Sequence, residues 1–312
     1  MAGRRQQILF AVRVAAWLVM GALVIGLARR MNWDEVFGAF AAADLRLALV
    51  ATLFGVPCVA LQGLRWSSLV NAVRKVPFAT PVAAIFVGQA ASAFLPMRAG
   101  EAVRTELLAR ATGMGRAASL GTVALDHSVN GLVMFAIAGS LPLLLPVPRW
   151  MAIVLWSGMA GAIALALVLL RLSRTPSSSE GRLGQLIAKM RSGLVALRNP
   201  AAVARAAGFS AASWSVEIAV AMLALAAFHL PHDLPHAMAV LFGVSLAQAI
   251  PAPPASLGNF ELGAGTALVA FGGPPEHAAA FAIGYHAMQL LPTLVAGGLM
   301  LSRFRLRLPQ HA

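Results

Sequence analysis

"VAAIFVGQAASAFLPMRAGEAVRTELLAR", residues 82–110, is the stretch that decides how this chain is interpreted. Its apolar run stops at Pro96, and charged side chains then crowd together: Arg98, Glu101, Arg104, Glu106 and Arg110. The chain is 59 % hydrophobic and has only 11 acidic residues in 312, so this concentration of charge stands out. A short helix that enters an apolar phase, breaks at the proline and turns back explains both halves of the stretch.

The composition around this stretch is that of a membrane protein. Charged residues make up 11 % of the chain, against about 25 % in soluble domains. Crossing a bilayer takes about 20 mostly apolar residues. Six stretches qualify as full spans, at residues 8–28, 45–64, 118–141, 150–170, 203–228 and 277–301. We therefore expect an all-α, polytopic helical membrane protein.

Two general features narrow the class further. The first apolar stretch follows Arg4 and Arg5 and resembles a secretory signal, but its length favours a retained first helix. Cys58 is the only cysteine, so no disulfide within the chain is expected. The net charge of +13 comes from arginines that alternate with the spans. This alternation favours the positive-inside rule over nucleic-acid binding, and no nucleic-acid partner is expected.

The positive-inside rule also predicts an orientation, with both termini cytoplasmic. The piece 79–95 and the charged stretch after it form one hairpin that opens to the cytoplasm. The pieces 236–250 and 259–271, broken at "PAPPAS", form a second hairpin that opens to the outside. The loop 171–200 is then cytoplasmic. All lysines and arginines lie inside except Arg29, Arg30, Arg46 and Arg149.

This topology divides a single transmembrane domain, 1–312, into two halves of opposite orientation, 1–141 and 142–312. Each half contains the order span, span, hairpin, span, which gives about six full spans and two re-entrant hairpins. Interrupted helices at matching places in inverted halves indicate a transporter site. The alternative is that both breaks are ordinary kinks in a protein of eight plain spans.

The charged stretch of the first hairpin has two interpretations. On a helix that starts at Pro96 and breaks near Gly100, the side chains of Arg98, Glu101 and Arg104 share one face. Glu106 and Arg110 are four apart and pair on another face. The row of three suits an anion, because guanidinium groups bind phosphate in a planar fork. It also suits an amphipathic helix that lies among lipid phosphates.

The second hairpin places its own polar group just after the break. Gly258 and Asn259 precede Glu261, whose position early in a helix is favourable in itself. The carboxylate also suits a bound cation or proton, or pairing with an arginine of the first hairpin. These three interpretations stay open.

The spans hold further polar residues. Asp126 and Asn130 share one face of the span 118–141, with His127 beside them, and intramembrane charge is a functional hypothesis by default. Neutralisation of Arg98 or Arg104 is the competing explanation for Asp126. His286 lies in the last span, where hydrogen-bonded packing competes with a proton relay. The histidines near Asp233 fit a solvated loop better than a metal site, and no metal or cofactor is expected.

Two motifs resemble a known family. The pattern LP-x-R-x-GE-x-x-R-x-x-LL is matched from Leu95 to Leu108, and P-x-P-G-x-x-G-x-x-E is matched in part from Pro251 to Glu261. The chain resembles the bacterial and archaeal flippase-like proteins named after the transmembrane region of lysylphosphatidylglycerol synthase, a family that includes hopanoid-associated members. It departs from the family pattern at Asp126-His127, at Tyr285-His286 and at Pro254-Ala255, where paired glycines are usual.

The resemblance implies a flippase-like protein that moves a lipid or a lipid-linked anionic molecule between leaflets. The expected site is Arg98, Gly100, Glu101, Arg104, Asp126, His127, Asn130, Gly258, Asn259, Glu261 and His286. Membrane lipids are the expected partners. The alternative is a non-transporting scaffold subunit that binds envelope biosynthesis proteins. The aminoacyl-transfer domain of the full synthases does not follow the spans here, so no enzyme activity is expected, and a membrane-embedded transferase is a third class.

Overall fold

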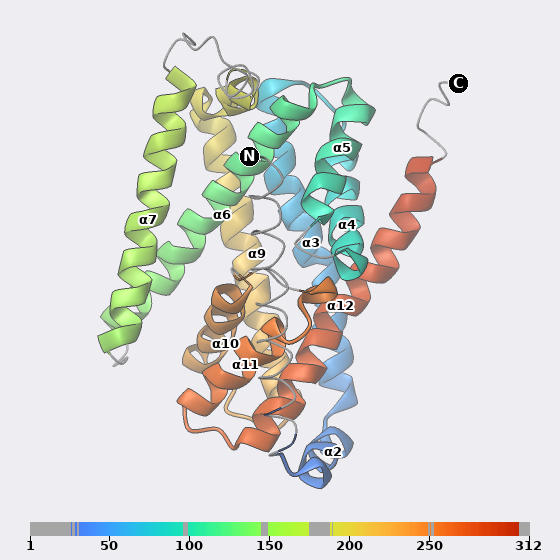
Figure 1. The fold of residues 1–312 in the computed structure, drawn as a ribbon, viewed down its shortest axis with the longest axis vertical. Coiled ribbons are helices and arrows are strands. Elements are labelled where there is room, and N and C mark those ends of the chain that lie inside the picture. Colours follow the sequence, from blue (N-terminus) through green and yellow to red (C-terminus); the bar gives the residue numbers. More distant parts are fainter. Residues whose placement is uncertain are drawn as a thin grey trace, which may run out of the picture. The chain divides into compact units, whose positions relative to one another are not determined.

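The structure, a computed structural model, describes residues 26, 29, 31–95, 99–144, 149–174, 188, 190–248, 250 and 253–305. These residues form helices and connecting turns with no strand among them, which confirms the all-α prediction. The helices are α2 Trp33–Ala42, α3 Leu45–Val73, α4 Ala79–Phe94, α5 Gly100–Thr112, α6 Arg116–Leu144, α7 Arg149–Arg174, α9 Pro200–Ala227, α10 Leu234–Ala247, α11 Asn259–Ala270 and α12 Pro275–Arg305, with short 3-10 turns at Val195–Arg198 and Pro254–Ser256 (Figure 1).

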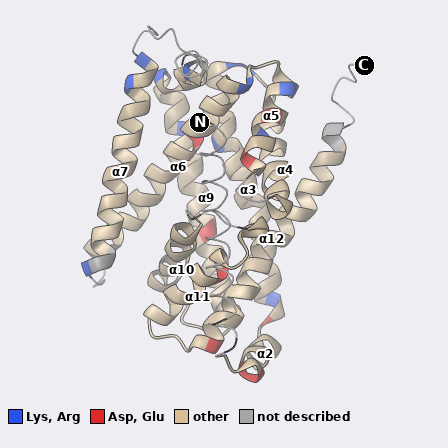
Figure 2. Cartoon of the chain, in the orientation of Figure 1, with Lys and Arg blue, Asp and Glu red and all other residues tan. Residues whose placement is uncertain are grey.

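Five of the six predicted spans are confirmed as long apolar helices in the described residues. They are Leu45–Val73, Arg116–Leu143, Ala152–Arg174, Pro200–Ala227 and Pro275–Ser302. The remaining prediction, 8–28, lies outside the described residues apart from Gly26. Helix α7 has the charge distribution typical of a membrane span, since its charged residues lie only at its two ends (Figure 2).

The four helices of the two predicted hairpins are much shorter. α4 and α5 have 16 and 13 residues, and α10 and α11 have 14 and 12. At about 1.5 Å per residue the longest reaches about 24 Å, which is less than the roughly 30 Å of a hydrocarbon core. Their lengths favour two hairpins over eight plain spans.

The chain forms two compact units, and each draws on both predicted sequence halves. Unit 1 comprises Met1–Gly55, Ala91–Ala99 and Glu217–Pro292. Unit 2 comprises Val56–Ala90, Gly100–Val216 and Thr293–Ala312. The inverted relation between 1–141 and 142–312 stays a prediction.

In unit 1, α10 and α11 lie side by side (Figure 1). They approach closely because glycines face each other: a β-carbon on Gly263 would lie 2.6 Å from the carbonyl oxygen of Gly243. Small residues allow helix backbones to meet in this way. The turn before α11 adopts left-handed backbone at Ala255 and Ser256 as well as at Gly258, which is a costly conformation for side chains other than glycine.

In unit 2, one apolar cluster joins α3, α4, α5 and α6, with Trp66, Phe86 and Leu108 at its centre. A second cluster packs Leu69 of α3 and Leu125 of α6 against Ala206 of α9. Gly88 of α4 touches the start of α5, where an added β-carbon would lie 2.9 Å from the carbonyl oxygen of Gly100. The N-terminal turn of α5 therefore packs closely against α4, and Leu108, further along α5, belongs to the apolar cluster with α3 and α6.

Candidate functional site

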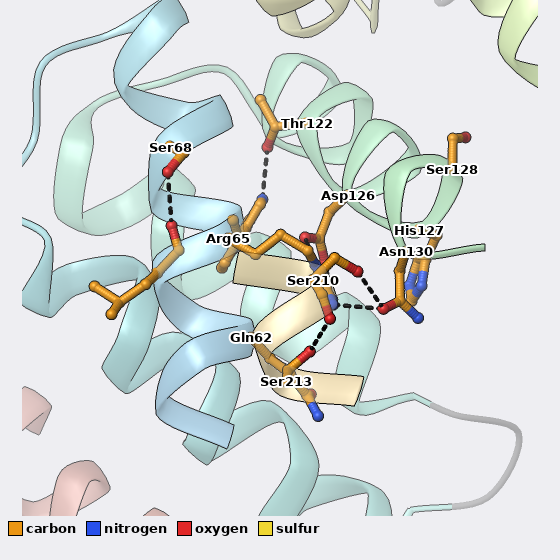
Figure 3. A network of polar contacts seen from close by, with 12 residues as sticks. Gln62, Arg65, Ser68, Thr122, Asp126, His127, Ser128, Asn130, Ser210 and Ser213 are labelled. Atoms are coloured by element: carbon orange, nitrogen blue, oxygen red, sulfur yellow. Dashed lines mark hydrogen bonds and ion pairs between the residues drawn. The ribbon is translucent and has the colours of Figure 1, made fainter. Parts of the chain in front are cut away.

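A buried ion pair joins α3 to α6 at the centre of unit 2. The Arg65 guanidinium donates from Nε to Asp126 Oδ1 at 2.7 Å and from Nη2 to Oδ2 at 3.2 Å. The side chains are 5 % and 0 % exposed. Figure 3 shows Arg65 extending from α3 toward Asp126 and Asn130 on α6, and its Nη1 donates to Asn130 Oδ1 at 2.6 Å. Such a two-pronged pair fixes the orientation of both groups.

Arg104 of α5 binds the same carboxylate from another direction. Its Nη1 donates to Asp126 Oδ2 at 3.3 Å, and its Nε donates to Glu101 Oε2 at 2.6 Å. Its Nη2 lies 3.0 Å from His127 Nε2. The guanidinium carbon lies 4.9 Å from the centre of the Trp66 ring, a favourable cation–π contact. Asp126 therefore holds two arginines from two different helices.

Neutral side chains surround these charges. Asn130 Oδ1 also accepts hydrogen bonds from Ser210 Oγ and Trp214 Nε1 of α9, both at 3.1 Å. Trp66 Nε1 donates to Thr122 Oγ1 at 3.1 Å. These bonds connect α9 to the ion pairs and orient the groups that bind the charges.

The site is electrically balanced within the described residues. Arg65 and Arg104 face the carboxylates of Asp126 and Glu101, and every guanidinium nitrogen has a partner. Burying a charge is tolerated only with such pairing, because the desolvation cost is several kcal/mol per ion. Exposure increases toward one side, where Glu101 and His127 have side chains 39 % and 49 % exposed. We call this half-exposed pair the rim.

The second hairpin forms a separate polar site in unit 1. Glu261 Oε1 lies 2.6 Å from His286 Nδ1 of α12, and its Oε2 accepts from the backbone N–H of Gly258 at 2.7 Å. The ring of Phe260 stacks on His286 at 4.3 Å. Asn259 Nδ2 closes the turn by donating to the carbonyls of Ala247 and Ile250. Glu261 thus caps α11, and it also binds a histidine of α12.

The sequence is matched by the family model described as the lysylphosphatidylglycerol synthase transmembrane region, over residues 8–297. This match covers far more than half of the chain. The chain belongs to that family. It matches no curated protein. The family membership predicted from the two motifs is therefore confirmed.

The structure gives physical roles to the family motif of the first hairpin. Gly100 begins α5 and contacts α4. Glu101 belongs to the rim, and Arg104 is the buried arginine that it binds. The helix was predicted to begin at Pro96, but Ala99 is a turn and the described helix begins at Gly100. Arg98 lies outside the described residues.

Of the predicted site residues in unit 2, Glu101, Arg104, Asp126, His127 and Asn130 come together in this family member. Arg65 was not among the predicted site residues, because the predicted span ended at residue 64. It lies inside α3, which continues to Val73, and its guanidinium is paired with Asp126. Trp66, Ser210 and Trp214 were missed as well. The polar sequence "RWSS", residues 65–68, directly follows an apolar run and was the signal that could have indicated Arg65 and Trp66.

The turn before α10 has a capping role. Asp233 Oδ1 accepts from the backbone N–H of His236 at 3.0 Å and lies 2.6 Å from its Nδ1. These bonds hold the pKa of Asp233 below its ordinary value. His229 Nε2 contacts the carbonyl of Ala42 instead. Nowhere in the described residues do three or more His, Cys, Asp or Glu side chains gather as metal ligands would.

On the opposite face of α5, Glu106 forms a separate, exposed ion pair. It binds Arg110 Nε at 2.6 Å and Arg116 Nη2 at 2.8 Å, as the predicted Glu106–Arg110 pairing required. Hydrogen bonds from these two arginines lower the pKa of Glu106 to about 2. Any stabilisation from a lowered carboxyl pKa is fully present above the unfolded-state pKa and is lost as the pH falls toward about 2.

Replacement of Glu106 by Gln is expected to change stability little. Exposed pairs of this kind are worth about 1 kcal/mol or less, because water and salt screen them. Thermal unfolding of the purified protein in detergent at neutral pH measures this, with low and high salt compared. A large loss of stability in Glu106→Gln would show that the outer face of α5 is packed more tightly than its exposure indicates.

Proposed function

We propose that this protein moves an anionic lipid, or a lipid-linked anionic molecule, between the leaflets of a bacterial inner membrane. Both termini are cytoplasmic in this proposal, and the lipid is not chemically changed. Membrane lipids are then the substrate and the principal partners of the chain.

The observation that carries the proposal is the buried Arg65–Asp126–Arg104 cluster, in which α3 and α6, both long enough to span a membrane, meet the short helix α5. A charged residue at the centre of a bilayer costs about 2.5–3.5 kcal/mol or more, so such residues tend to serve transport pathways. Arg104 lies about one turn after Gly100, so the cluster includes a side chain from the beginning of α5. Irregular backbone at membrane depth is tolerated where it lines a cavity or is buried in protein.

The rim supplies the chemistry for an anionic headgroup. Arg104 is buried, but two of its acceptors, Glu101 and His127, are half-exposed. A phosphate oxygen that arrives at the rim can replace one of these acceptors without leaving Arg104 unpaired. Guanidinium groups bind phosphate in two-pronged geometry, so this exchange leaves the buried charge satisfied at each stage.

A scaffold function is the second candidate, and one observation favours it. All six guanidinium nitrogens of Arg65 and Arg104 already have partners within the described residues. An ion cluster in which every charged group already has a partner can have a purely structural role, which is to fix the packing of α3, α5 and α6. Fully satisfied buried polar networks have this effect in other proteins. In that case the protein binds envelope biosynthesis proteins and carries no lipid.

The two candidates are separated by a matched pair of variants on one helix. Glu101→Gln removes the charge at the rim, whereas Glu106→Gln makes the same change on the opposite face of α5. Each protein is reconstituted in liposomes that contain a fluorescent phosphatidylglycerol, and leaflet exchange is followed by dithionite quenching. We expect Glu101→Gln to slow exchange about tenfold, because a hydrogen bond to a charged group contributes about 1.5–3 kcal/mol, and Glu106→Gln to match the wild type.

Three other outcomes count against the proposal. Exchange no faster than in protein-free liposomes favours the scaffold, which pull-down with envelope proteins then tests. Equal exchange in both variants removes Glu101 from the site. A change in the mass of the recovered lipid identifies a transferase.

A further inference from the structure

One ring nitrogen at the rim lies between a hydrogen-bond donor and a hydrogen-bond acceptor, and it cannot bind both at once. His127 Nε2 lies 3.0 Å from Arg104 Nη2, which can only donate, and 3.2 Å from Glu101 Oε2, which can only accept. A ring nitrogen without a proton accepts, and a ring nitrogen with a proton donates. Nε2 therefore satisfies Arg104 or Glu101, but never both.

We propose that His127 is a proton-binding site whose occupancy sets whether Arg104 is available to an anionic headgroup. With the proton on Nδ1 only, Nε2 accepts from Arg104 Nη2, and the guanidinium is fully satisfied. With Nε2 also protonated, His127 donates to Glu101 Oε2, and Arg104 Nη2 is left without an acceptor in the described part of the site. A phosphate oxygen then fills the vacant position.

The charge count leads to the same conclusion. Among the described residues, the charged groups that face His127 are Glu101 and Arg104 from α5 and Asp126 from α6, and Asp126 is held in turn by Arg65 of α3. In this described part of the site, two guanidiniums and two carboxylates give a net charge of zero while His127 is neutral. Protonation of His127 gives the site a net charge of about +1, which balances the single negative charge of a phosphodiester. Each ligand then strengthens the binding of the other, because coupling between two sites is reciprocal.

His127 is suited to this role by its exposure and its chemistry. Its side chain is 49 % exposed, whereas Arg65, Arg104 and Asp126 are nearly inaccessible. A proton can therefore reach the histidine while the ion pairs behind it stay in place. Histidine is also the side chain whose charge ordinarily changes between about pH 5 and pH 8. The functional consequence of this inference rests on the proposed lipid transport, but the binding step does not.

The binding step is tested on the purified full chain by NMR with 13C-labelled histidine. The signal of His127 is assigned by its loss in His127→Gln. Its titration midpoint is measured alone, with short-chain phosphatidylglycerol below its micelle concentration, and with free glycerophosphoglycerol. We expect either anion to raise the midpoint by roughly 0.7 pH units or more, which corresponds to a coupling of about fivefold. A shift with the lipid alone assigns the anion as a lipid headgroup.

The transport step is tested by leaflet exchange in liposomes at about pH 5 and about pH 8, the two ends of the usual histidine range. We expect faster exchange at the lower pH in the wild type and in His232→Gln, a change in the outer loop. His127→Gln should lose this dependence but keep slow exchange. A midpoint shift without any exchange contradicts the proposed function and leaves the proton site standing. An unmoved midpoint, or an unchanged pH dependence in His127→Gln, overturns the proton site.

Discussion

Replacement of Asp126 by Ala is expected to lower the free energy of unfolding by about 3–5 kcal/mol. The carboxylate receives hydrogen bonds from Arg65 and Arg104, and none of the three side chains is more than 6 % exposed. Its removal leaves two desolvated guanidiniums that, among the described residues, share only Glu101, Asn130 and His127 as acceptors. An unpaired buried charge costs more than the pair itself contributes, so the loss is severe.

The measurement is unfolding in mixed micelles of increasing SDS fraction, followed by far-UV circular dichroism. Asp126→Asn serves as the matched variant, because it keeps the shape and one acceptor oxygen but removes the charge. We expect it to lie between the wild type and Asp126→Ala. The double variant with Arg65→Met should lose much less than the sum of the single changes, since contacting residues are not additive. An exposed ion pair contributes about 1 kcal/mol or less. A loss below this value for Asp126→Ala would refute the prediction that the buried cluster contributes strongly to the stability of the fold.

This cluster also marks the limit of what the sequence predicts. Asp126 and Asn130 were predicted on one helical face, and the pairing of Asp126 with Arg104 was one of two open interpretations. Arg65 was missed because the positive-inside rule treats an arginine after an apolar run as a solvated residue. Its partner is 61 positions away, and no local pattern indicates a contact over that distance. The structure therefore extends α3 beyond the predicted end of the span.

The apolar periodicity was more informative for the helices than for their ends. Hydropathy alone predicts the five described spans, since the bilayer leaves few alternatives to a helix. The hairpins follow from proline and glycine at their breaks. Glu261 was predicted at the start of a helix, and His286 was singled out separately. Their contact depends on how α11 packs against α12, which the sequence does not encode locally.

Substitution of Gly263 by Ala is expected to destabilise the second hairpin. The added β-carbon would lie 2.6 Å from the carbonyl oxygen of Gly243 and 2.9 Å from the β-carbon of Ala247. Both neighbours belong to α10 and cannot rotate away, so the helices must separate. Overpacking costs about 1–3 kcal/mol, and this cost exceeds the gain of about 1 kcal/mol that Ala brings over Gly inside a helix.

Gly265 provides the matched control, because it lies on the same helix only two residues away. A β-carbon there meets its nearest neighbour, the carbonyl oxygen of Ala278, at 3.9 Å, which is ordinary contact. Gly265→Ala is therefore expected to be neutral or stabilising by up to about 1 kcal/mol. Separation of α10 from α11 would also loosen Glu261 from His286, so Gly263→Ala should alter the NMR signal of that histidine. Equal unfolding curves for the two variants would show that the hairpin is not held together by the contact between Gly243 and Gly263.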